Sequence, residues 1–209
     1  MKLGIYCAGG MVGRESFDLA TRLNACNSRW EDVFFISDVE IEERFYRIDE
    51  LNPSDVEIVI AHGTPRYRRE IFDRAASRGF KFRTLIDPSA SISPTSKIGR
   101  GVLIFQNVIV SSNAIIDDNT AIQQSTVIGH DDSIGKNCVF GLNAVLSGNV
   151  SIGDESFIGV NASIREKISV GDRTIVGMGS VVIRSIENDL VVVGNPAREL
   201  RKNLDGKVY

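Results

Sequence analysis

Hydrophobic positions in the second half of the chain recur with a period of six residues. Every sixth residue from Ile86 to Val182 is apolar, without interruption. These seventeen positions are Ile86, Ile92, Ile98, Ile104, Val110, Ile116, Ile122, Ile128, Ile134, Phe140, Leu146, Ile152, Ile158, Ile164, Val170, Val176 and Val182. Neither a helical period nor the two-residue alternation of a hairpin produces this spacing. The pattern predicts a coiled parallel sheet in which each hexad is a short strand followed by a corner.

The other positions of the hexad fit the same picture. Four residues after each apolar position the side chain is usually small, as at Ala90 and Ala162, with exceptions at Asp132, Ile168 and Ile186. Glycine directly follows eight of the apolar positions, at Gly99, Gly129, Gly135, Gly141, Gly153, Gly159, Gly171 and Gly177. We expect the large side chains to point inward and the small ones to fit where the wall turns. The glycines are expected to supply the backbone angles that a corner needs.

The first 85 residues follow a different pattern, in which short apolar runs alternate with helical stretches. Strands are predicted over residues 2–7, 33–36, 56–61 and 80–85, with a helix ending near Leu23 and another over residues 66–78. This alternation predicts a small parallel sheet of Rossmann type, with ligands at the carboxyl ends of its strands. The expected domains cover residues 1–85 and 86–187, followed by a closing segment and tail over residues 188–209.

Composition narrows the functional classes. The chain has 24 Lys and Arg against 27 Asp and Glu, and its net charge of -3 provides no overall field for a polyanion such as DNA. Cys7, Cys26 and Cys138 are widely spaced and match neither a disulfide framework nor a zinc site. There is no export signal and no apolar run long enough to span a bilayer, so we expect a cytoplasmic protein.

The chain offers only two histidines as general bases, His62 and His130. His130 is followed by Asp131 and Asp132, and Asp132 replaces the small residue that the hexad expects. Carboxylates beside an imidazole fix its tautomer and raise its basicity, so this hexad is a candidate for acid–base chemistry. An exposed polar corner without a chemical role is the alternative. His62 follows a strand end, where a ligand contact and a plain loop position are equally consistent with the sequence.

Several segments together resemble one family. The hexads are similar to those of the hexapeptide-repeat acyltransferases, whose left-handed parallel β-helix has three hexads in each triangular coil. Gly-His-Asp at 129–131, Ser-Gly-Asn-Val at 147–150, Val-Gly-Asn-Pro-Ala-Arg at 193–198 and Ala-Gly-Gly at 8–10 resemble the sialic-acid O-acetyltransferases and nucleotide-sugar N-acetyltransferases. The resemblance covers nearly the whole chain. It implies an α/β N-terminal Rossmann-like domain that binds a nucleotide sugar, followed by an all-β left-handed parallel β-helix.

The resemblance also implies the chemistry at His130. This residue would remove a proton from the acceptor amine or hydroxyl as it attacks the thioester of acetyl-CoA, and Asp131 would orient its ring. A backbone N–H near Gly148 would stabilise the oxyanion. Direct attack in a ternary complex needs no enzyme nucleophile and no metal.

Acetyl-CoA, on the same resemblance, would lie in a groove between neighbouring β-helices of a homotrimer, along Gly148, Val160 and Met178. Val139 occupies the position at which some amino-sugar enzymes have a second histidine that binds coenzyme A, so that hydrogen bond is missing here. Three basic residues are candidates for the 3′-phosphate, with a solvated tail as the alternative: Arg198, Arg201 and Lys202.

The nucleotide is expected at the N-terminal glycine turn. Residues 7–12 (CAGGMV) lack the first and last glycines of the dinucleotide fingerprint G-x-G-x-x-G, so an NAD site is weakly supported. The family instead uses this turn and the following strand ends to hold the nucleotide of the sugar. The substrate-binding residues expected on this basis are Gly9, Gly10, Met11, Ser37, Asp38 and Gly63.

The function favoured by these observations is acetyl-CoA-dependent N-acetylation of a nucleotide-linked 4-amino-4,6-dideoxy sugar for bacterial surface glycans. O-acetylation of a sugar such as sialic acid uses the same base and thioester, and the sequence hardly separates the two. A non-catalytic β-helix scaffold and an NAD-dependent oxidoreductase are further alternatives. The His130–Asp131 pair argues against the scaffold, and the hexads argue against the oxidoreductase. Whether the nucleotide is UDP, GDP or dTDP stays open.

Overall fold

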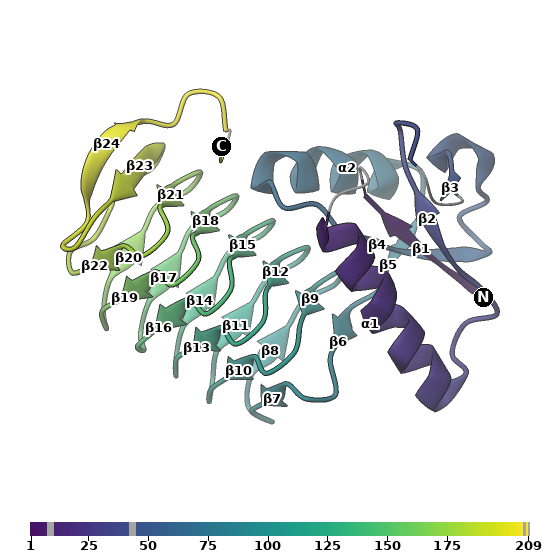
Figure 1. The fold of residues 1–209 in the computed structure, drawn as a ribbon, viewed down its shortest axis with the longest axis horizontal. Coiled ribbons are helices and arrows are strands. Elements are labelled where there is room, and N and C mark those ends of the chain that lie inside the picture. Colours follow the sequence, from purple (N-terminus) through teal and green to yellow (C-terminus); the bar gives the residue numbers. More distant parts are fainter. Residues whose placement is uncertain (8–10, 42–44, 207, 209) are drawn as a thin grey trace.

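The computed structural model describes residues 1–7, 11–41, 45–206 and 208, and it joins a small α/β unit to a triangular β-helix (Figure 1). The α/β unit contains β1 (Lys2–Tyr6), α1 (Met11–Asn27), β2 (Val33–Ile36), β3 (Phe45–Tyr46), the 3-10 helix η1 (Ile48–Glu50), β4 (Val56–Ile60), α2 (Pro65–Ser77) and β5 (Lys81–Phe82). Its five strands are parallel and lie in the order β3-β2-β1-β4-β5. The carboxyl ends of β1, β2 and β4 therefore meet at one edge of the sheet.

Two features of this unit differ from the sequence prediction. The strand expected over residues 80–85 is divided between two sheets, because Phe82 pairs with Ile58 in β4 whereas Leu85 pairs with Leu103 in the β-helix. The short strand β3, which pairs with β2, was not expected. Two residues are too few to give a periodic signal.

The β-helix consists of two-residue strands separated by four-residue corners. In chain order the strands are β6 (Leu85–Ile86), β7 (Ser91–Ile92), β8 (Lys97–Ile98), β9 (Leu103–Ile104), β10 (Ile109–Val110), β11 (Ile115–Ile116), β12 (Ala121–Ile122), β13 (Val127–Ile128), β14 (Ser133–Ile134), β15 (Val139–Phe140), β16 (Val145–Leu146), β17 (Ser151–Ile152), β18 (Phe157–Ile158), β19 (Ser163–Ile164), β20 (Ser169–Val170), β21 (Ile175–Val176) and β22 (Val181–Val182). Successive strands lie on three faces in turn, so β6, β9 and every third strand after them form face 1. Face 2 begins with β7 and face 3 with β8. The repeat forms the left-handed β-helix that the resemblance implied.

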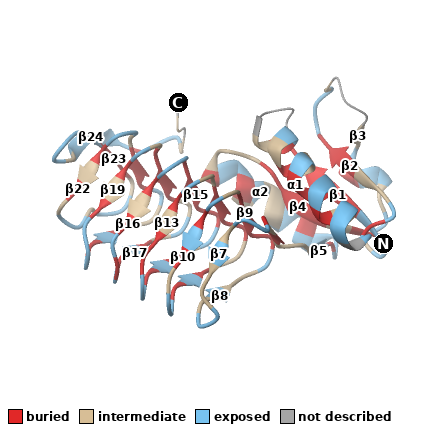
Figure 2. Cartoon of the chain, turned by 60° about the horizontal axis from the view of Figure 1, so that its bottom comes forward, coloured by how far each residue is buried: buried red, intermediate tan, exposed pale blue. Residues whose placement is uncertain are grey.

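Neighbouring strands on one face pair in parallel and in register, so that equivalent residues of successive coils lie opposite one another, as Ile116 and Ile134 do. The second residue of each strand points into the prism, where most of these aliphatic side chains are fully buried. Small side chains such as Ala114 and Cys138 fill the corners of the same core. Figure 2 shows the buried residues in red along the inside of the prism. Stacked aliphatic side chains therefore replace the aromatic core that this chain lacks.

The corner glycines have a different cause from the one expected. Left-handed backbone occurs two residues after the glycine position, mostly at asparagine, which tolerates positive φ: Asn107, Asn113, Asn119, Ser125, Asp131, Asn137, Asn143, Asn149, Glu155, Asn161, Lys167 and Arg173. At Gly129 an added Cβ would instead lie 2.5 Å from the carbonyl oxygen of Ser147. At Gly135 it would lie 2.4 Å from Oδ1 of Asp154. These glycines are required by the close approach of the next coil.

The α/β unit packs against face 1. The outward residues of this face are apolar and buried in one cluster with residues of the α/β unit such as Leu19 and Phe35. They are Leu85, Leu103, Ala121, Val139, Phe157 and Ile175. At the far end, β23 (Leu190–Val193) pairs with β21 and β24 (Arg198–Lys202) pairs antiparallel with β23, after which the chain returns toward α2 (Figure 1). Neither described α-helix has the length and apolar character required to cross a bilayer.

Candidate active site

His130 lies at the corner between β13 on face 2 and β14 on face 3, with its side chain 60% exposed. Its Nδ1 atom is 2.8 Å from Oδ2 of Asp131. The other oxygen of that carboxylate accepts a hydrogen bond from the Asn113 amide, one coil earlier, at 3.0 Å. The structure therefore brings together the imidazole and the carboxylate that the sequence singled out.

Asp131 can face the ring because it occupies the left-handed corner position, with φ of 59°. The hydrogen bonds with His130 and then with Asn113 hold the pKa of the Asp131 carboxyl below its ordinary value. An ionised carboxylate only accepts hydrogen bonds, so Nδ1 of His130 carries the proton between them. The lone pair of Nε2 is then directed away from Asp131 and is available to an acceptor group.

Asp132 has a different environment from the one expected. Its side chain is buried, and its two oxygens accept hydrogen bonds from the backbone N–H groups of Gly129 (2.7 Å) and Val150 (2.8 Å). Burial raises the pKa of Asp132, although both N–H groups favour the charged form. The expectation that two carboxylates contact the imidazole is wrong, because only Asp131 is bonded to it. Asp132 joins the coil of His130 to the next coil.

Gly148 lies against the imidazole. Residues 130 and 148 form a parallel bridge, in which the Asn149 N–H donates to the His130 carbonyl at 2.9 Å. A Cβ added to Gly148 would lie 2.8 Å from Nε2 of His130, and the backbone φ of 153° also favours glycine. The Gly148 N–H donates to no other residue in the part of the chain that the structure describes. A backbone donor without an acceptor therefore lies beside the exposed ring.

The other residues expected to contact coenzyme A lie elsewhere on the β-helix. Val160 and the exposed Met178 occupy the corner between faces 1 and 2, whereas His130 and Gly148 occupy the corner between faces 2 and 3. Val139 belongs to face 1 and is buried in the apolar cluster against the α/β unit. A single chain therefore does not bring these residues to His130.

The basic residues of the C-terminal segment, Arg198, Arg201 and Lys202, lie on the exposed strand β24. The guanidinium groups of Arg198 and Arg201 donate to the carbonyl oxygens of Ala197 and Lys202 respectively. β24 closes the last coil of the β-helix, several coils beyond that of His130. A contact with the 3′-phosphate of coenzyme A stays a prediction.

A second candidate site is a cavity of about 500 Å³ at the carboxyl edge of the α/β sheet. Its lining comes from the ends of β1, β2 and β4 and from one face of α2: Tyr6, Cys7, Asp38, Val39, His62, Tyr67, Glu70, Ile71 and Arg74. The Tyr6 hydroxyl donates to Asp38 at 2.8 Å, and the Arg74 guanidinium contacts both groups. Burial, followed by the hydrogen bond to Asp38, raises the pKa of Tyr6. These three side chains form a charged, hydrogen-bonded wall of the cavity, whose other lining includes His62 and Glu70.

His62 is held at the end of β4. Its Nδ1 atom accepts a hydrogen bond from the Thr64 N–H at 3.1 Å, and its ring packs edge-on against Tyr67 with centroids 5.0 Å apart. Burial, with a further effect of the nearby Arg68 charge, lowers the pKa of His62. His62 is therefore a neutral hydrogen-bonding side chain of the cavity at neutral pH.

The residues expected to bind the nucleotide have different outcomes. Gly9 and Gly10 lie outside the described residues, and Met11 begins α1. Asp38 lines the cavity. Gly63 follows His62 and lies beside Val12. The Ser37 side chain is buried and bonded to the backbone of Val39, so its hydroxyl does not reach the cavity.

Tyr67, Ile71 and Arg74 line the cavity but were not expected there from the sequence. These residues are spaced three or four apart, so they lie on one face of α2. Because α2 begins directly after the loop that follows β4, that face borders the strand ends. The spacing, combined with the strand prediction, was the signal that could have identified them.

Comparisons with known proteins agree with this architecture. The profile of the family described as "Hexapeptide repeat of succinyl-transferase" matches residues 133–148 and 149–184. No curated protein matches the chain at a significant level. The acetyltransferase domain of PglB from Neisseria gonorrhoeae FA1090 is similar over 95% of this chain and 99% of that domain, with 31% identity and a TM-score of 0.87. The same domain has been solved with acetyl coenzyme A, at 30% identity over 95% of this chain and 98% of that one, with a TM-score of 0.87.

Two further solved structures are similar over nearly the whole chain. WeeI from Acinetobacter baumannii AYE is 27% identical over 96% of this chain and 100% of its own, with a TM-score of 0.87. PerB from Caulobacter crescentus, in complex with CoA and GDP-perosamine, is 26% identical over 95% of this chain and 97% of its own, with a TM-score of 0.85. The similarity therefore includes both the α/β unit and the β-helix.

Proposed function

The chain belongs to the hexapeptide-repeat acyltransferases, in the family of sialic-acid O-acetyltransferases and nucleotide-sugar N-acetyltransferases, and from this premise we propose that it acetylates the amino group of a nucleotide-linked 4-amino-4,6-dideoxy sugar. The observation that carries the proposal is the exposed His130 ring, bonded to Asp131 and adjacent to Gly148. Acetyl-CoA is the donor, in agreement with the related PglB domain solved with acetyl coenzyme A. GDP-perosamine bound to PerB supports a nucleotide sugar as the acceptor.

His130 acts as the general base. Its Nε2 atom accepts a proton from the acceptor amine while the amine nitrogen attacks the carbonyl carbon of the thioester. The oxyanion that forms accepts a hydrogen bond from the Gly148 N–H, which is otherwise unused. When the carbon–sulfur bond breaks, the imidazolium returns the proton to the sulfur of coenzyme A. The products are the acetamide and free coenzyme A, and His130 is neutral again.

Asp131 fixes the tautomer of His130, so that only one ring nitrogen accepts the proton of the acceptor. Because its carboxylate accepts the Nδ1 proton, Nε2 is the atom that is free to accept another. The same negative charge stabilises the imidazolium that exists between proton uptake and proton return. Asn113 fixes the second oxygen of the carboxylate and thereby the orientation of the pair.

Acetyl-CoA binds between two copies of the chain. Gly148 and Met178 lie at different corners of one prism, so a groove that contains both requires a neighbouring prism. A copy that presents its own Val160 and Met178 beside the His130 corner completes the groove. In a homotrimer each copy provides both corners, and three equivalent sites result.

The nucleotide part of the acceptor binds in the cavity of the α/β unit, between the strand ends and the face of α2 that begins in its first turn at Tyr67. Backbone N–H groups at a helix N-terminus favour phosphate oxygens, and Asp38 offers a carboxylate to the nucleoside. Residues 1–85 are then the nucleotide-sugar domain and residues 86–187 the acetyltransferase domain. Residues 188–209 are the closing segment and tail.

Free thiol release tests this function directly. The purified protein is mixed with acetyl-CoA and, separately, with UDP-, GDP- and dTDP-linked 4-amino sugars, and the coenzyme A thiol is followed with a chromogenic reagent. We expect release with one nucleotide sugar. The His130→Ala variant should lose on the order of a hundredfold or more in kcat, as expected for a general base.

Ser112 is the matched control, because it occupies the same exposed corner one coil before His130. Ser112→Ala should keep the full rate, and both variants should have the unfolding temperature of the wild type. Unchanged turnover in His130→Ala would remove this residue from the mechanism. If the wild type binds acetyl-CoA but releases no thiol with any amino sugar, a hydroxyl acceptor is indicated. If it does not bind acetyl-CoA, a scaffold is favoured.

A further inference from the structure

A fully buried arginine connects the α/β unit to the β-helix. Arg68, on α2, is 0% exposed. Its Nη1 donates to the carbonyl oxygens of Ile60 (2.6 Å) and His62 (3.3 Å). Its Nε donates to the carbonyl of Asn119 (2.7 Å), and its Nη2 donates to Oδ1 of the same residue (3.0 Å). One planar group therefore joins the end of β4 to a corner of the β-helix.

The partners of Arg68 are amide oxygens rather than carboxylates. Burying a cation in this way is unfavourable unless every donor is satisfied, and burial lowers the pKa of Arg68. An apolar side chain would fill the same interface without that cost. The guanidinium differs from an apolar side chain in geometry, because its rigid fork fixes the direction of several acceptors at once. The contact is thus suited to setting an orientation.

Asn119, in the β-helix, also donates a hydrogen bond back to Arg68. It is buried, has a left-handed φ of 57°, and donates from Nδ2 to the Arg68 carbonyl at 3.0 Å. The same amide lies 2.8 Å from Oδ1 of Asn137, to which it also donates. Asn137 is the corner residue that follows His130 and β14 along the coil. A continuous set of hydrogen bonds thus links the end of β4 to the coil that carries the catalytic pair.

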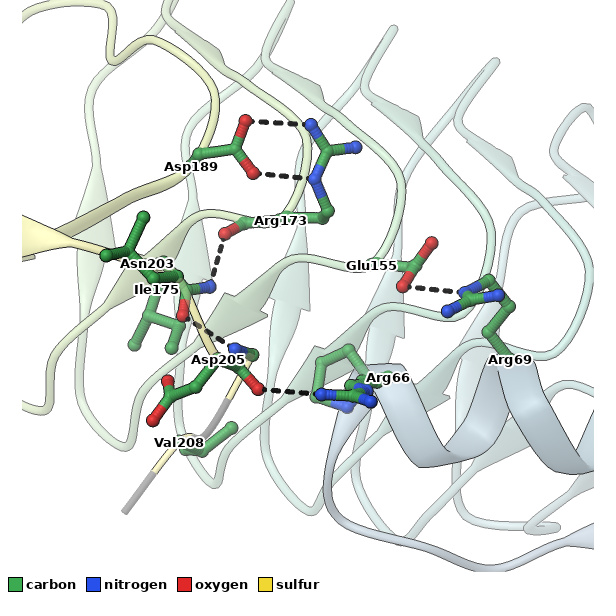
Figure 3. Close-up of a pocket in the computed structure, with 12 residues that line it drawn as sticks. Arg66, Arg69, Glu155, Arg173, Ile175, Asp189, Asn203, Asp205 and Val208 are labelled. Carbon is green, nitrogen blue, oxygen red and sulfur yellow. Dashed lines mark hydrogen bonds and ion pairs between the residues drawn. The ribbon is translucent and has the colours of Figure 1, made fainter.

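The carbonyls held by Arg68 lie at the start of the loop, residues 61–64, that borders the cavity. Ile60 ends β4, and His62 lies in the cavity wall. Two other polar contacts of α2 lie nearer the surface, as Figure 3 shows: Arg69 with Glu155 (2.9 Å) and Arg66 with the Asp205 carbonyl (3.1 Å). Solvent screens such partly exposed contacts more than buried ones. Arg68 is the buried contact among these arginines.

We propose that Arg68 and Asn119 are positioning residues that hold loop 61–64 of the nucleotide cavity at a fixed orientation to the β-helix. This inference rests on the proposed function in one respect, that the cavity binds the nucleotide of the acceptor sugar. We call the hydrogen bonds of Arg68 with Asn119, Ile60 and His62 the clamp. The clamp affects binding of the acceptor sugar, because it holds the wall of the cavity. It does not contact the corner of His130 and Gly148, where the acetyl group is transferred.

Asn119→Gly breaks the clamp without disturbing the backbone, because glycine readily adopts the left-handed conformation. Asn143→Gly is the matched control: Asn143 has the same φ of 57° and donates to Asn161 as Asn119 donates to Asn137, but it lies exposed at another corner. We expect Asn119→Gly to raise the KM for the nucleotide sugar by on the order of tenfold, as loss of positioning does. The KM for acetyl-CoA should stay unchanged in Asn119→Gly. Asn143 lies at the corner between faces 1 and 2, where the proposed function places Val160 and Met178, so Asn143→Gly is the control for the KM of the nucleotide sugar alone, which should match the wild type.

A conservative variant separates positioning from general loosening. Asn119→Asp keeps an oxygen for the Arg68 guanidinium, and the Asn137 amide can rotate to donate to the other oxygen. The hydrogen bond to the Arg68 carbonyl is lost, because a carboxylate cannot donate, so part of the KM increase should be reversed. Equal KM values for the nucleotide sugar in Asn119→Gly and Asn143→Gly would overturn the proposal. The proposal would also be overturned if Asn119→Gly raised the KM for acetyl-CoA as much as the KM for the nucleotide sugar, since that result indicates a general loss of structure.

Backbone amide exchange tests the clamp independently of catalysis. The peptide covering residues 60–68 should exchange faster in Asn119→Gly than in Asn143→Gly, while peptides of β13 and β14 exchange alike. If the wild type transfers acetyl to no acceptor but this difference is present, the clamp stands and the proposed function fails. If the wild type is active and exchange is the same in both variants, the clamp fails and the proposed function stands.

Discussion

The β-helix and the α/β sheet are both built from parallel strands, but their polar side chains form hydrogen bonds in different ways. In the β-helix a corner hydroxyl bonds to the next coil, and the bond recurs: Thr120 donates to the Gly135 carbonyl at 2.9 Å and Ser156 to the Gly171 carbonyl at 2.8 Å. In the α/β sheet, Tyr6, Asp38 and Arg74 come from three different elements and form one network. A change in the repeat therefore affects one corner, whereas a change in the cavity affects several elements.

The corner of His130 shows how a repeat accommodates a departure from its own pattern. The positions equivalent to Asp132 in the adjacent coils are Ala114 and Val150, both apolar and buried. A carboxylate is tolerated between them because both of its oxygens accept backbone N–H groups. The exception to the repeat thus stabilises the corner that carries the exposed imidazole.

The largest effect is expected from a charge placed in the core of the repeat. Ile134 is 1% exposed, so Ile134→Asp buries an unpaired carboxylate and should destabilise the chain by more than about 4 kcal/mol. Ser133→Asp adds the same charge to the neighbouring residue, which points outward, and should be nearly neutral. Chemical unfolding followed by circular dichroism measures both. Similar midpoints for the two variants would contradict the inward and outward assignment of β14.

The second prediction concerns the contact between two adjacent coils. Gly148→Ala keeps the backbone N–H but places a methyl group within 2.8 Å of Nε2 of His130. The ring must move, and kcat should fall by about tenfold to a hundredfold. In a His130→Ala background the same change should cost less stability, because the ring that it displaces is absent. A normal kcat for Gly148→Ala would show that the position of the ring is not critical.

The third prediction addresses the junction of the two regions. Asp87 is buried, and its carboxylate accepts hydrogen bonds from the N–H and hydroxyl of Ser89 and from the Arg22 guanidinium at 2.7 Å. Burial alone would raise the pKa of Asp87, but these donors outweigh it and the pKa lies below the ordinary value. Asp87→Asn should therefore reduce the free energy of unfolding by about 2 kcal/mol at neutral pH.

The pH dependence of this effect has a definite sign. Because the folded-state pKa of Asp87 is lowered, its stabilisation is fully present above the unfolded pKa of about 4 and is lost as the pH falls through the folded value. The difference between wild type and Asp87→Asn should shrink over that acidic range. Denaturant unfolding at several pH values measures it. A difference that is constant down to the most acidic sample would show that the charge of Asp87 does not stabilise the junction.

The same contrast explains how much the sequence could predict. A repeat gives each position many equivalents, so the coil, its inward residues and the exceptional hexad of His130 were all visible in the spacing. The cause of the corner glycines was not visible, because the atoms that crowd them belong to the next coil. The spacing alone could not show that Val160 and His130 lie at different corners, because that follows only when three hexads are assigned to each coil, as the family resemblance implied.

The α/β unit was less predictable because it has no equivalent positions to compare. Strand ends could be located, and Asp38, which follows one of them, lines the cavity, whereas its contact with a nucleotide stays a prediction. The network that joins Asp38 to Tyr6 and Arg74 depends on how α2 packs over the sheet, which no local pattern encodes. A residue at a strand end faces either a ligand or its own backbone, and only the packing decides between them.

Ser37 illustrates this ambiguity and provides the smallest of the predicted effects. Its hydroxyl donates to the Val39 carbonyl at 2.7 Å and accepts the Val39 N–H at 3.2 Å, so it stabilises the turn that follows β2. Ser37→Ala should lower the free energy of unfolding by about 1 kcal/mol and leave the affinity for UDP or GDP unchanged in calorimetry. Asp38→Ala, one residue later and in the cavity wall, should weaken nucleotide binding. If Ser37→Ala instead weakened binding at unchanged stability, the hydroxyl would contact the ligand directly and the turn would have to open when the nucleotide binds.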